Sequence, residues 1–112
     1  MKKLLLALTL FGLVGCHTMA DLRAQKPEAS FTSNKTVDEI SQCVLFGWQE
    51  MTTRYGDVTI QPYHTGKTVM VGIIEFADVT NNGEISEVKY YYQTDLFQSR
   101  IDSRLDVIKR CI

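Results

Sequence analysis

The chain has 112 residues, and its 12 Lys and Arg against 13 Asp and Glu give a formal net charge of −1. This length provides for one small domain. Because acidic and basic residues are nearly equal in number, the composition excludes an extended basic surface for nucleic acid or anionic lipid. The sequence contains no internal repeat and no low-complexity tract.

The N-terminal segment has the charge and hydrophobicity of an export signal. Lys2 and Lys3 precede residues 4–15, which are apolar except for Thr9. Twelve helical residues reach only about 18 Å, whereas the hydrocarbon core of a bilayer is about 30 Å thick. The run therefore predicts a signal peptide rather than a membrane-spanning helix.

The apolar run ends in Leu13, Val14, Gly15 and Cys16. These four residues resemble the lipobox of bacterial lipoprotein signal peptides, and the resemblance does not extend beyond Cys16. It implies that the Cys16 thiol receives a diacylglyceryl group, that residues 1–15 are removed, and that the new amine is usually acylated. A signal peptide that is cut elsewhere, or a short buried helix with an incidental cysteine, are the alternatives.

The same resemblance implies an anchor and a location. Lipoproteins of this family that stay at the inner membrane tend to have aspartate after the lipidated cysteine, whereas this chain has His17. We therefore expect a protein of the bacterial outer membrane, attached through lipid on Cys16 and facing the periplasm. Each buried acyl methylene contributes about 0.8 kcal/mol, and two or more chains make such an attachment stable.

The segment that follows the cysteine lacks sustained hydrophobic periodicity and is rich in Ser, Thr, Ala and Asn around Pro27. We predict that residues 16–35 form the lipidated N-terminus and a flexible tether, although residues 19–25 also allow a brief helix. Residues 36–112 are expected to form a single small α+β domain. Without Lys2 and Lys3 the mature chain has 10 basic and 13 acidic side chains, a formal charge of −3.

A first helix is predicted to begin after Thr36. The Thr36 hydroxyl and the Glu39 carboxylate have the spacing of a capping box, in which each side chain accepts from the backbone amide of the other residue. Apolar residues then recur with helical spacing, which indicates one buried face. These residues are Val37, Ile40, Val44, Gly47, Trp48 and Met51, with Cys43 on the same side.

Three strand-like runs follow, at residues 58–63, 68–79 and 85–94. Each of the two intervening turns has a glycine, Gly66 or Gly83, which suits the left-handed position of a three-residue hairpin loop. Such loops place Ile60 opposite Met70 in the first hairpin, and Thr80 opposite Glu84 in the second. They also place Glu75 opposite Lys89. The runs predict a three-stranded antiparallel meander.

Residues 97–112 are predicted to form a second amphipathic helix. Its apolar stripe consists of Phe97, Ile101, Leu105, Ile108 and Ile112. The charged residues, Arg100 and Arg104 among them, are expected largely outside that stripe.

The cysteines predict how the two helices are placed. With Cys16 assigned to lipid, Cys43 and Cys111 are an even pair in an oxidising compartment, which predicts a disulfide, with two buried thiols as the alternative. Disulfide-linked α-carbons lie within about 7 Å, whereas helices on opposite faces of a sheet are roughly 20 Å apart. The expected fold is therefore helix, three-stranded antiparallel meander, helix, with both helices on one sheet face.

This arrangement leaves the other sheet face uncovered. Val69, Val71, Ile73 and Tyr91 are expected there, and an apolar patch of this kind is a candidate surface for a protein partner or for self-association. Cover by the tether, with Phe31, is one alternative. Sugar rings or another small ligand stacking on Trp48 and the tyrosines are a weaker one.

Two functional hypotheses follow, and neither involves catalysis. The chain has only two histidines, His17 and His64, no nucleophile-elbow motif and no spacing of His, Cys and acidic residues typical of a metal site. We expect no catalytic residue, no metal and no cofactor. The first hypothesis is a lipid-anchored envelope protein that binds an envelope protein as an accessory or assembly factor. The alternative is an inhibitor or immunity-type lipoprotein that blocks a cell-wall or toxic enzyme through loop 64–67 or 81–83.

Overall fold

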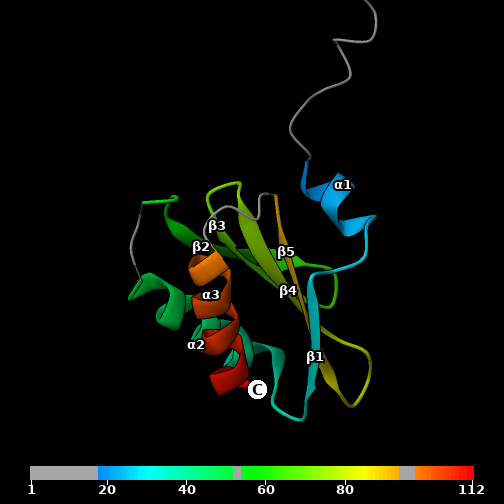
Figure 1. Ribbon diagram of the computed structural model, residues 1–112. Helices are drawn as coiled ribbons and strands as arrows, with labels where there is room; N and C mark the ends of the chain where they lie inside the picture. The colour runs from blue at the N-terminus through cyan, green and yellow to red at the C-terminus, as the bar shows by residue number, and fades with distance from the viewer. Residues whose placement is uncertain (1–17, 52–53, 94–97) are drawn as a thin grey trace, which may run out of the picture.

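A computed structural model describes residues 18–51, 54–93 and 98–112, and it has the expected α+β architecture (Figure 1). Within these residues lie three helices and a five-stranded antiparallel sheet. In chain order the elements are α1 (Met19–Arg23), β1 (Ala29–Ser33), α2 (Val37–Gln49), β2 (Val58–Tyr63), β3 (Gly66–Val71), β4 (Glu75–Asn81), β5 (Ser86–Tyr92) and α3 (Gln98–Cys111).

The strand order is β1-β5-β4-β3-β2, so the predicted three-stranded meander is incomplete. One additional strand arises because the predicted run 68–79 divides at a turn, where Gly72 has a φ of +51° and Ile74 donates to the Val71 carbonyl. The other is β1, which pairs with β5 from within the predicted tether. Its side chains alternate between half-buried and exposed, as in a strand with one face on the core.

Both predicted hairpin registers are wrong. In the first hairpin Tyr63 pairs with Gly66 across a two-residue connection, and Ile60 lies opposite Val69 rather than Met70. His64 has a φ of +47° there, as the first residue of a tight hairpin turn requires. Because successive side chains in a strand point to opposite faces, this one-residue difference exchanges the faces of β3.

The second hairpin has a four-residue connection at residues 82–85. Asn82 donates its amide to the Ile85 carbonyl, and Thr80 pairs with Glu87 instead of Glu84. The observed register places Asp78 opposite Lys89, a pair of opposite charges.

The helices α2 and α3 lie on the same side of the sheet, as predicted (Figure 1). A disulfide joins Cys43 to Cys111, with the α-carbons 5.7 Å apart. The helices also approach closely where Gly47 faces Val107, since a Cβ at Gly47 would lie 2.5 Å from a Val107 methyl carbon. The predicted capping box is confirmed, because Thr36 and Glu39 each accept from the amide of the other.

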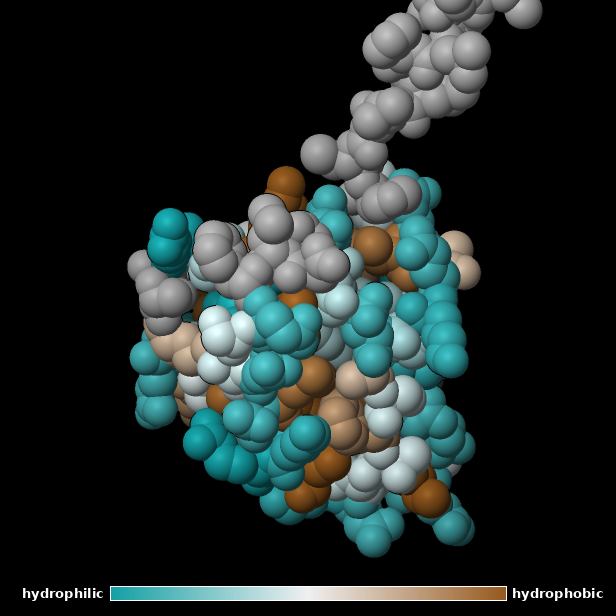
Figure 2. All heavy atoms as spheres, viewed as in Figure 1, coloured by the Kyte–Doolittle hydropathy of each residue, from teal (hydrophilic) through white to brown (hydrophobic). Residues whose placement is uncertain are grey.

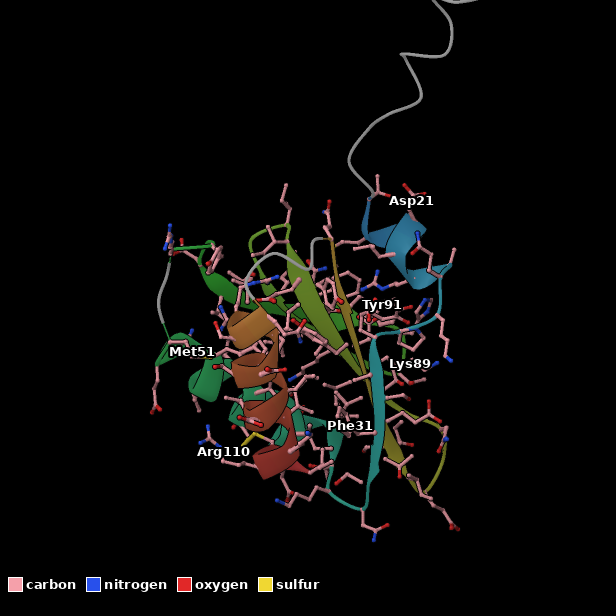
Figure 3. The ribbon with its side chains drawn as sticks, viewed as in Figure 1. Asp21, Phe31, Met51, Lys89, Tyr91 and Arg110 are labelled. Carbon is pink, nitrogen blue, oxygen red and sulfur yellow. A yellow bond between two sulfur atoms is a disulfide. The ribbon has the colours of Figure 1, made fainter. Side chains whose placement is uncertain are left out.

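The main core lies between these two helices and the sheet. Its buried members include Ile40, Val44, Trp48, Val69, Val71, Val79, Val88, Tyr90, Ile101 and Ile108. Figure 2 shows apolar atoms along the seam between α3 and β1, where Phe31 points toward α3 (Figure 3). The partly buried hydrophobic residues packed against this core include Ala29, Phe31, Leu105 and Ile112.

The helix α1 covers part of the opposite sheet face. Its Leu22 is buried against Phe76 and Tyr91, with Met19 and Met70 packed beside them. The expectation of a flexible tether through residue 35 is therefore wrong for residues 18–33, which hold a helix and a strand. The brief helix allowed at residues 19–25 is the alternative that the structure contains. Cys16 and the signal segment lie outside the described residues.

No helix in the described ranges 18–51, 54–93 and 98–112 has both the length and the apolar character needed to cross a membrane.

Candidate functional site

The predicted partner surface does not exist as a continuous open face. Val69 and Val71 have no exposed surface and belong to the core beneath α2 and α3, because the register of β3 differs from the predicted one. Tyr91 faces the opposite side and is buried under α1 (Figure 3). Ile73 alone is exposed, at 71 %, and it lies in the turn between β3 and β4.

A charged contact attaches α1 to the sheet. Arg23 donates through Nε and Nη2 to both carboxylate oxygens of Asp78, each at 2.8 Å, and Nη2 also donates to the Thr68 hydroxyl at 2.9 Å. The Asp78 hydrogen bond raises the pKa of Arg23, and the guanidinium also lies 3.8 Å from the Tyr63 ring centroid. Paired geometry of this kind is stronger than a single surface ion pair. The N-terminal helix is thus held to β4 by specific contacts.

A second charged cluster lies inside the main core. Glu75, at the start of β4, is fully buried and accepts from Tyr90 Oη at 2.7 Å, from Arg104 Nε at 2.6 Å and from Arg100 Nη1. Burial raises the pKa of Tyr90 above its ordinary range, and the negative charge of Glu75 is the second cause. The Trp48 indole N–H donates to the Arg104 carbonyl, which ties α2 to the same place.

Sequence patterns missed this cluster, although part of the signal was present. Arg104 follows Ile101 by three residues and precedes Ile108 by four, so it lies in the helical stripe that the neighbouring apolar residues define. Glu75 is the only charged residue within the apolar run 69–77. Charged residues in such positions are buried only when they are paired, and the pairing joins residues 25 to 29 positions apart.

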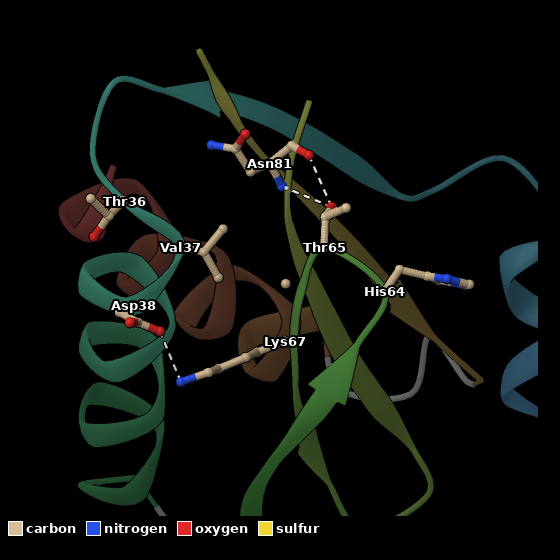
Figure 4. A pocket seen from close by; sticks show the side chains of 8 residues that line it. Thr36, Val37, Asp38, His64, Thr65, Lys67 and Asn81 are labelled. Carbon is tan, nitrogen blue, oxygen red and sulfur yellow. Dashed lines mark hydrogen bonds and ion pairs between the residues drawn. The ribbon is translucent and has the colours of Figure 1, made fainter. Parts of the chain in front are cut away.

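A pocket of about 530 Å³ lies where the N-terminus of α2 meets the β2–β3 hairpin (Figure 4). It is lined by Thr36, Val37, Asp38, His64, Thr65, Gly66, Lys67 and Asn81. Gly66 is required in this position, because a Cβ would overlap the carbonyl oxygen of Val79 on the neighbouring strand.

The polar groups of this pocket are already engaged with one another. Lys67 Nζ lies 2.8 Å from Asp38 Oδ1, and the Thr65 hydroxyl donates to the Asn81 carbonyl at 2.9 Å (Figure 4). The His64 ring points away from the cavity and packs edge-on against Tyr63. The pocket thus offers a firm rim with hydrogen-bonding groups, and it brings together the two loops that the inhibitor hypothesis names separately.

In the part of the chain that the structure describes, no three His, Cys, Asp or Glu residues form a group able to hold a metal ion.

No protein-family model matches this sequence, and comparison with curated proteins and with solved structures finds no significant similarity.

Proposed function

We propose that this chain is a non-enzymatic lipoprotein of the bacterial cell envelope, anchored in the outer membrane through Cys16 and facing the periplasm. The lipobox-like residues 13–16 support the anchor. The disulfide between Cys43 and Cys111 supports an oxidising compartment such as the periplasm, because such bonds are rare in reducing ones.

The observation that carries the proposal is the position of α1. The helix begins at Met19, and its N-cap is Thr18, so only His17 separates the lipidated Cys16 from the folded domain. Two residues extend at most about 7 Å. The Arg23–Asp78 contact and the burial of Leu22 then hold α1 on the sheet. The domain accordingly sits at the membrane surface instead of moving at the end of a long tether.

The surface that we propose for a partner is formed by two hairpin loops. Figure 1 shows α1 in the upper part of the view and the β4–β5 hairpin at the bottom. Hydrogen bonds between Thr65 and Asn81 join the β2–β3 hairpin to the β4–β5 hairpin. The two hairpin loops thus form one continuous edge beside the pocket, which we call the hairpin rim. We propose that an envelope protein binds at this rim, and that the chain acts as an accessory or assembly module.

A second candidate, an inhibitor or immunity-type protein, is favoured by the same rim. Proteins that block an enzyme need a protruding element that keeps its shape on insertion. The hydrogen bonds between Thr65 and Asn81, and that from the Gly83 amide to the Asn81 side chain, keep the two loops in a defined shape. The two candidates share the binding surface and differ in what the partner does.

Site-specific photo-crosslinking in intact envelopes tests the proposal. A crosslinking residue at His64 or Asn82 should give one discrete adduct, whereas the same residue at the exposed Asp102 of α3 should give none. A His64→Ala/Asn82→Ala variant should lose the adduct formed from a crosslinker at Thr65. Equal labelling at Asp102, or no adduct at either loop, contradicts binding at the hairpin rim. An identified partner whose catalytic rate falls on binding selects the inhibitor candidate.

A further inference from the structure

A second cleft, of about 290 Å³, lies on the sheet face that α1 partly covers. The end of α1 and the strands β2, β4 and β5 form its walls. On β5, Val88 and Tyr90 belong to the main core, so the residues that alternate with them face this cleft. The lining residues from the helix and the strands are Arg23, Tyr63, Asp78, Thr80, Lys89 and Tyr91.

The Tyr91 hydroxyl has no hydrogen-bond partner within the described part of the chain. Tyr91 is only 6 % exposed, and its ring stacks on Phe76 with the centroids 5.0 Å apart. Burial raises the pKa of Tyr91, and the negative charge of Asp78 is the second cause, so the hydroxyl keeps its proton. Buried tyrosine hydroxyls usually have a partner. The cleft wall therefore holds a donor whose acceptor comes from outside these residues.

The one carboxylate among the lining residues is already engaged. Both oxygens of Asp78 accept from Arg23, and Oδ1 also accepts from the Thr68 hydroxyl at 2.6 Å. The charges of Asp78 and Arg23 neutralise each other within this pair. Asp78 thus leaves the other donors of the cleft, Tyr91 among them, without an acceptor.

The Lys89 ammonium adds a positive charge to the cleft. Its Nζ lies 4.0 Å from a Glu87 oxygen, which is the longest ion pair in the described ranges, and the Lys89 side chain is 45 % exposed. The Glu87 carboxylate also accepts from the Asn82 side chain at 3.0 Å, and Glu87 does not line the cleft. An exposed pair of this length contributes little to stability, so Lys89 can turn to a bound anion at small cost.

We propose that this cleft binds a carboxylate group. The Tyr91 hydroxyl and the Lys89 ammonium donate to its oxygens, and the Thr80 hydroxyl is a third donor on the same lining. Hydrogen bonds to an ionised carboxylate are stronger than those between neutral groups. The single negative charge matches that of Lys89, and the volume admits a carboxylate with the few carbon atoms of an acidic side chain.

An acidic side chain of the bound partner is one source of the carboxylate, and a free small carboxylate is the other. His64 and Thr65 line this cleft as well as the pocket beside the hairpin rim. Figure 4 shows the His64 ring directed away from that pocket, toward the side on which α1 lies. A protein bound at the rim therefore lies next to the cleft. The partner source, but not the carboxylate site, rests on the proposed function.

NMR titration of the purified full chain in non-ionic detergent, in a buffer without carboxylates, tests the proposal. The probes are N-acetylglutamate methylamide, its neutral glutamine counterpart and acetate, and the readout is the backbone amide resonances of β4 and β5. We expect saturable shifts with at least one carboxylate probe and none with the glutamine compound. Tyr91→Phe and Lys89→Gln should each weaken binding about tenfold. Lys109→Gln, which removes an exposed positive charge on α3, should bind as the parent does.

Tighter binding of the glutamate probe supports an acidic side chain of the partner, and equal or tighter binding of acetate supports a free small carboxylate. The absence of saturable shifts with both overturns the proposal, as does equal binding of the glutamine compound or equal weakening by Lys109→Gln. Tyr91→Phe keeps the ring on Phe76 and should be as stable as the parent in urea denaturation. A loss of stability would reveal a partner for the hydroxyl within the chain and would also overturn the proposal. Because the titration contains no envelope protein, its result does not depend on the crosslinking experiment.

Discussion

Arg23 of α1 and Asp78 of β4 form a two-pronged ion pair, in which Nε and Nη2 each lie 2.8 Å from a different carboxylate oxygen. The Asp78 side chain is 5 % exposed, and the Arg23 side chain is 21 % exposed. This contact joins α1 to β4, the central strand of the sheet. In the lipid-anchored protein that we propose, this contact would keep the domain close to Cys16.

Arg23→Ala should release α1 from the sheet. It removes the two hydrogen bonds to Asp78 and leaves that carboxylate with the Thr68 hydroxyl, so the free energy of unfolding should fall by about 2 kcal/mol. Amide hydrogen exchange at residues 18–24 should become much faster. Lys67→Ala breaks the exposed Asp38 pair and should cost less than about 1 kcal/mol. Unchanged exchange at residues 18–24 in Arg23→Ala would show that α1 does not depend on this contact.

Glu75→Ala should be among the most destabilising substitutions in the chain. It leaves the buried guanidinium groups of Arg100 and Arg104 without their carboxylate, at a cost of about 3–5 kcal/mol in urea denaturation. Glu87→Ala removes a half-buried carboxylate on β5, whose ion pair with Lys89 is 4.0 Å long, and should cost below about 1 kcal/mol. Similar losses for the two variants would mean that the buried cluster is not what stabilises α3 on the sheet.

Tyr90 should make stability depend on alkaline pH. Burial and the neighbouring Glu75 raise the Tyr90 pKa in the folded protein, whereas the pKa of a tyrosine in the unfolded chain is about 10. Above that pH the unfolded state loses a proton that the folded state keeps, so the free energy of unfolding decreases as pH rises, by up to about 1.4 kcal/mol per unit. Urea denaturation from pH 8 to 11 should show a shallower decrease for Tyr90→Phe. Identical slopes for both proteins would refute this role.

Loss of the disulfide should strongly destabilise the domain. Cys43 and Cys111 are separated by 68 positions, for which loop-closure reasoning gives about 4 kcal/mol. We expect Cys43→Ala/Cys111→Ala to lose about 2–5 kcal/mol in urea denaturation. Because Cys43 is exposed, a reductant should reach the bond and lower the stability of the parent but not that of the variant. A variant as stable as the oxidised parent would contradict a structural role for the bond.

Local sequence signals predicted the parts of the fold that depend on neighbouring residues. The capping box at Thr36 and the apolar spacing of α2 are set within a few residues, and both agree with the structure. The disulfide between Cys43 and Cys111 then placed α2 and α3 on one face correctly. The short α1 was only an open alternative, because its stability comes from Arg23 and Leu22 contacts with distant strands rather than from its own length.

The same local signals do not predict the strand register correctly. The sequence pattern assigns the left-handed conformation of the first hairpin to Gly66, whereas in the structure His64 adopts that conformation and Gly66 allows a close approach to Val79. The resulting one-residue error moved Val69 and Val71 from the core to a face that seemed open. Gly83 does have a positive φ, but its hairpin loop has one residue more than expected.

The buried charges were missed for a different reason. Arg100, Arg104 and Glu75 are each polar enough to be assigned to the surface when considered alone. Their burial is tolerated because they meet in three dimensions and satisfy most of one another's hydrogen bonds. Pairing of this kind depends on the folded arrangement of α3 against β4, and a pattern along the chain cannot supply it.

Mass spectrometry of the mature protein from bacterial envelopes tests the account most directly. We predict an N-terminal peptide that begins at Cys16 and carries a diacylglyceryl thioether, with an acylated amine, and this modification should be absent from Cys16→Ser. Such a terminus would place the lipid two residues before the N-cap of α1. A mature chain that begins elsewhere, or one with an unmodified Cys16, would contradict a domain held at the membrane by its first helix.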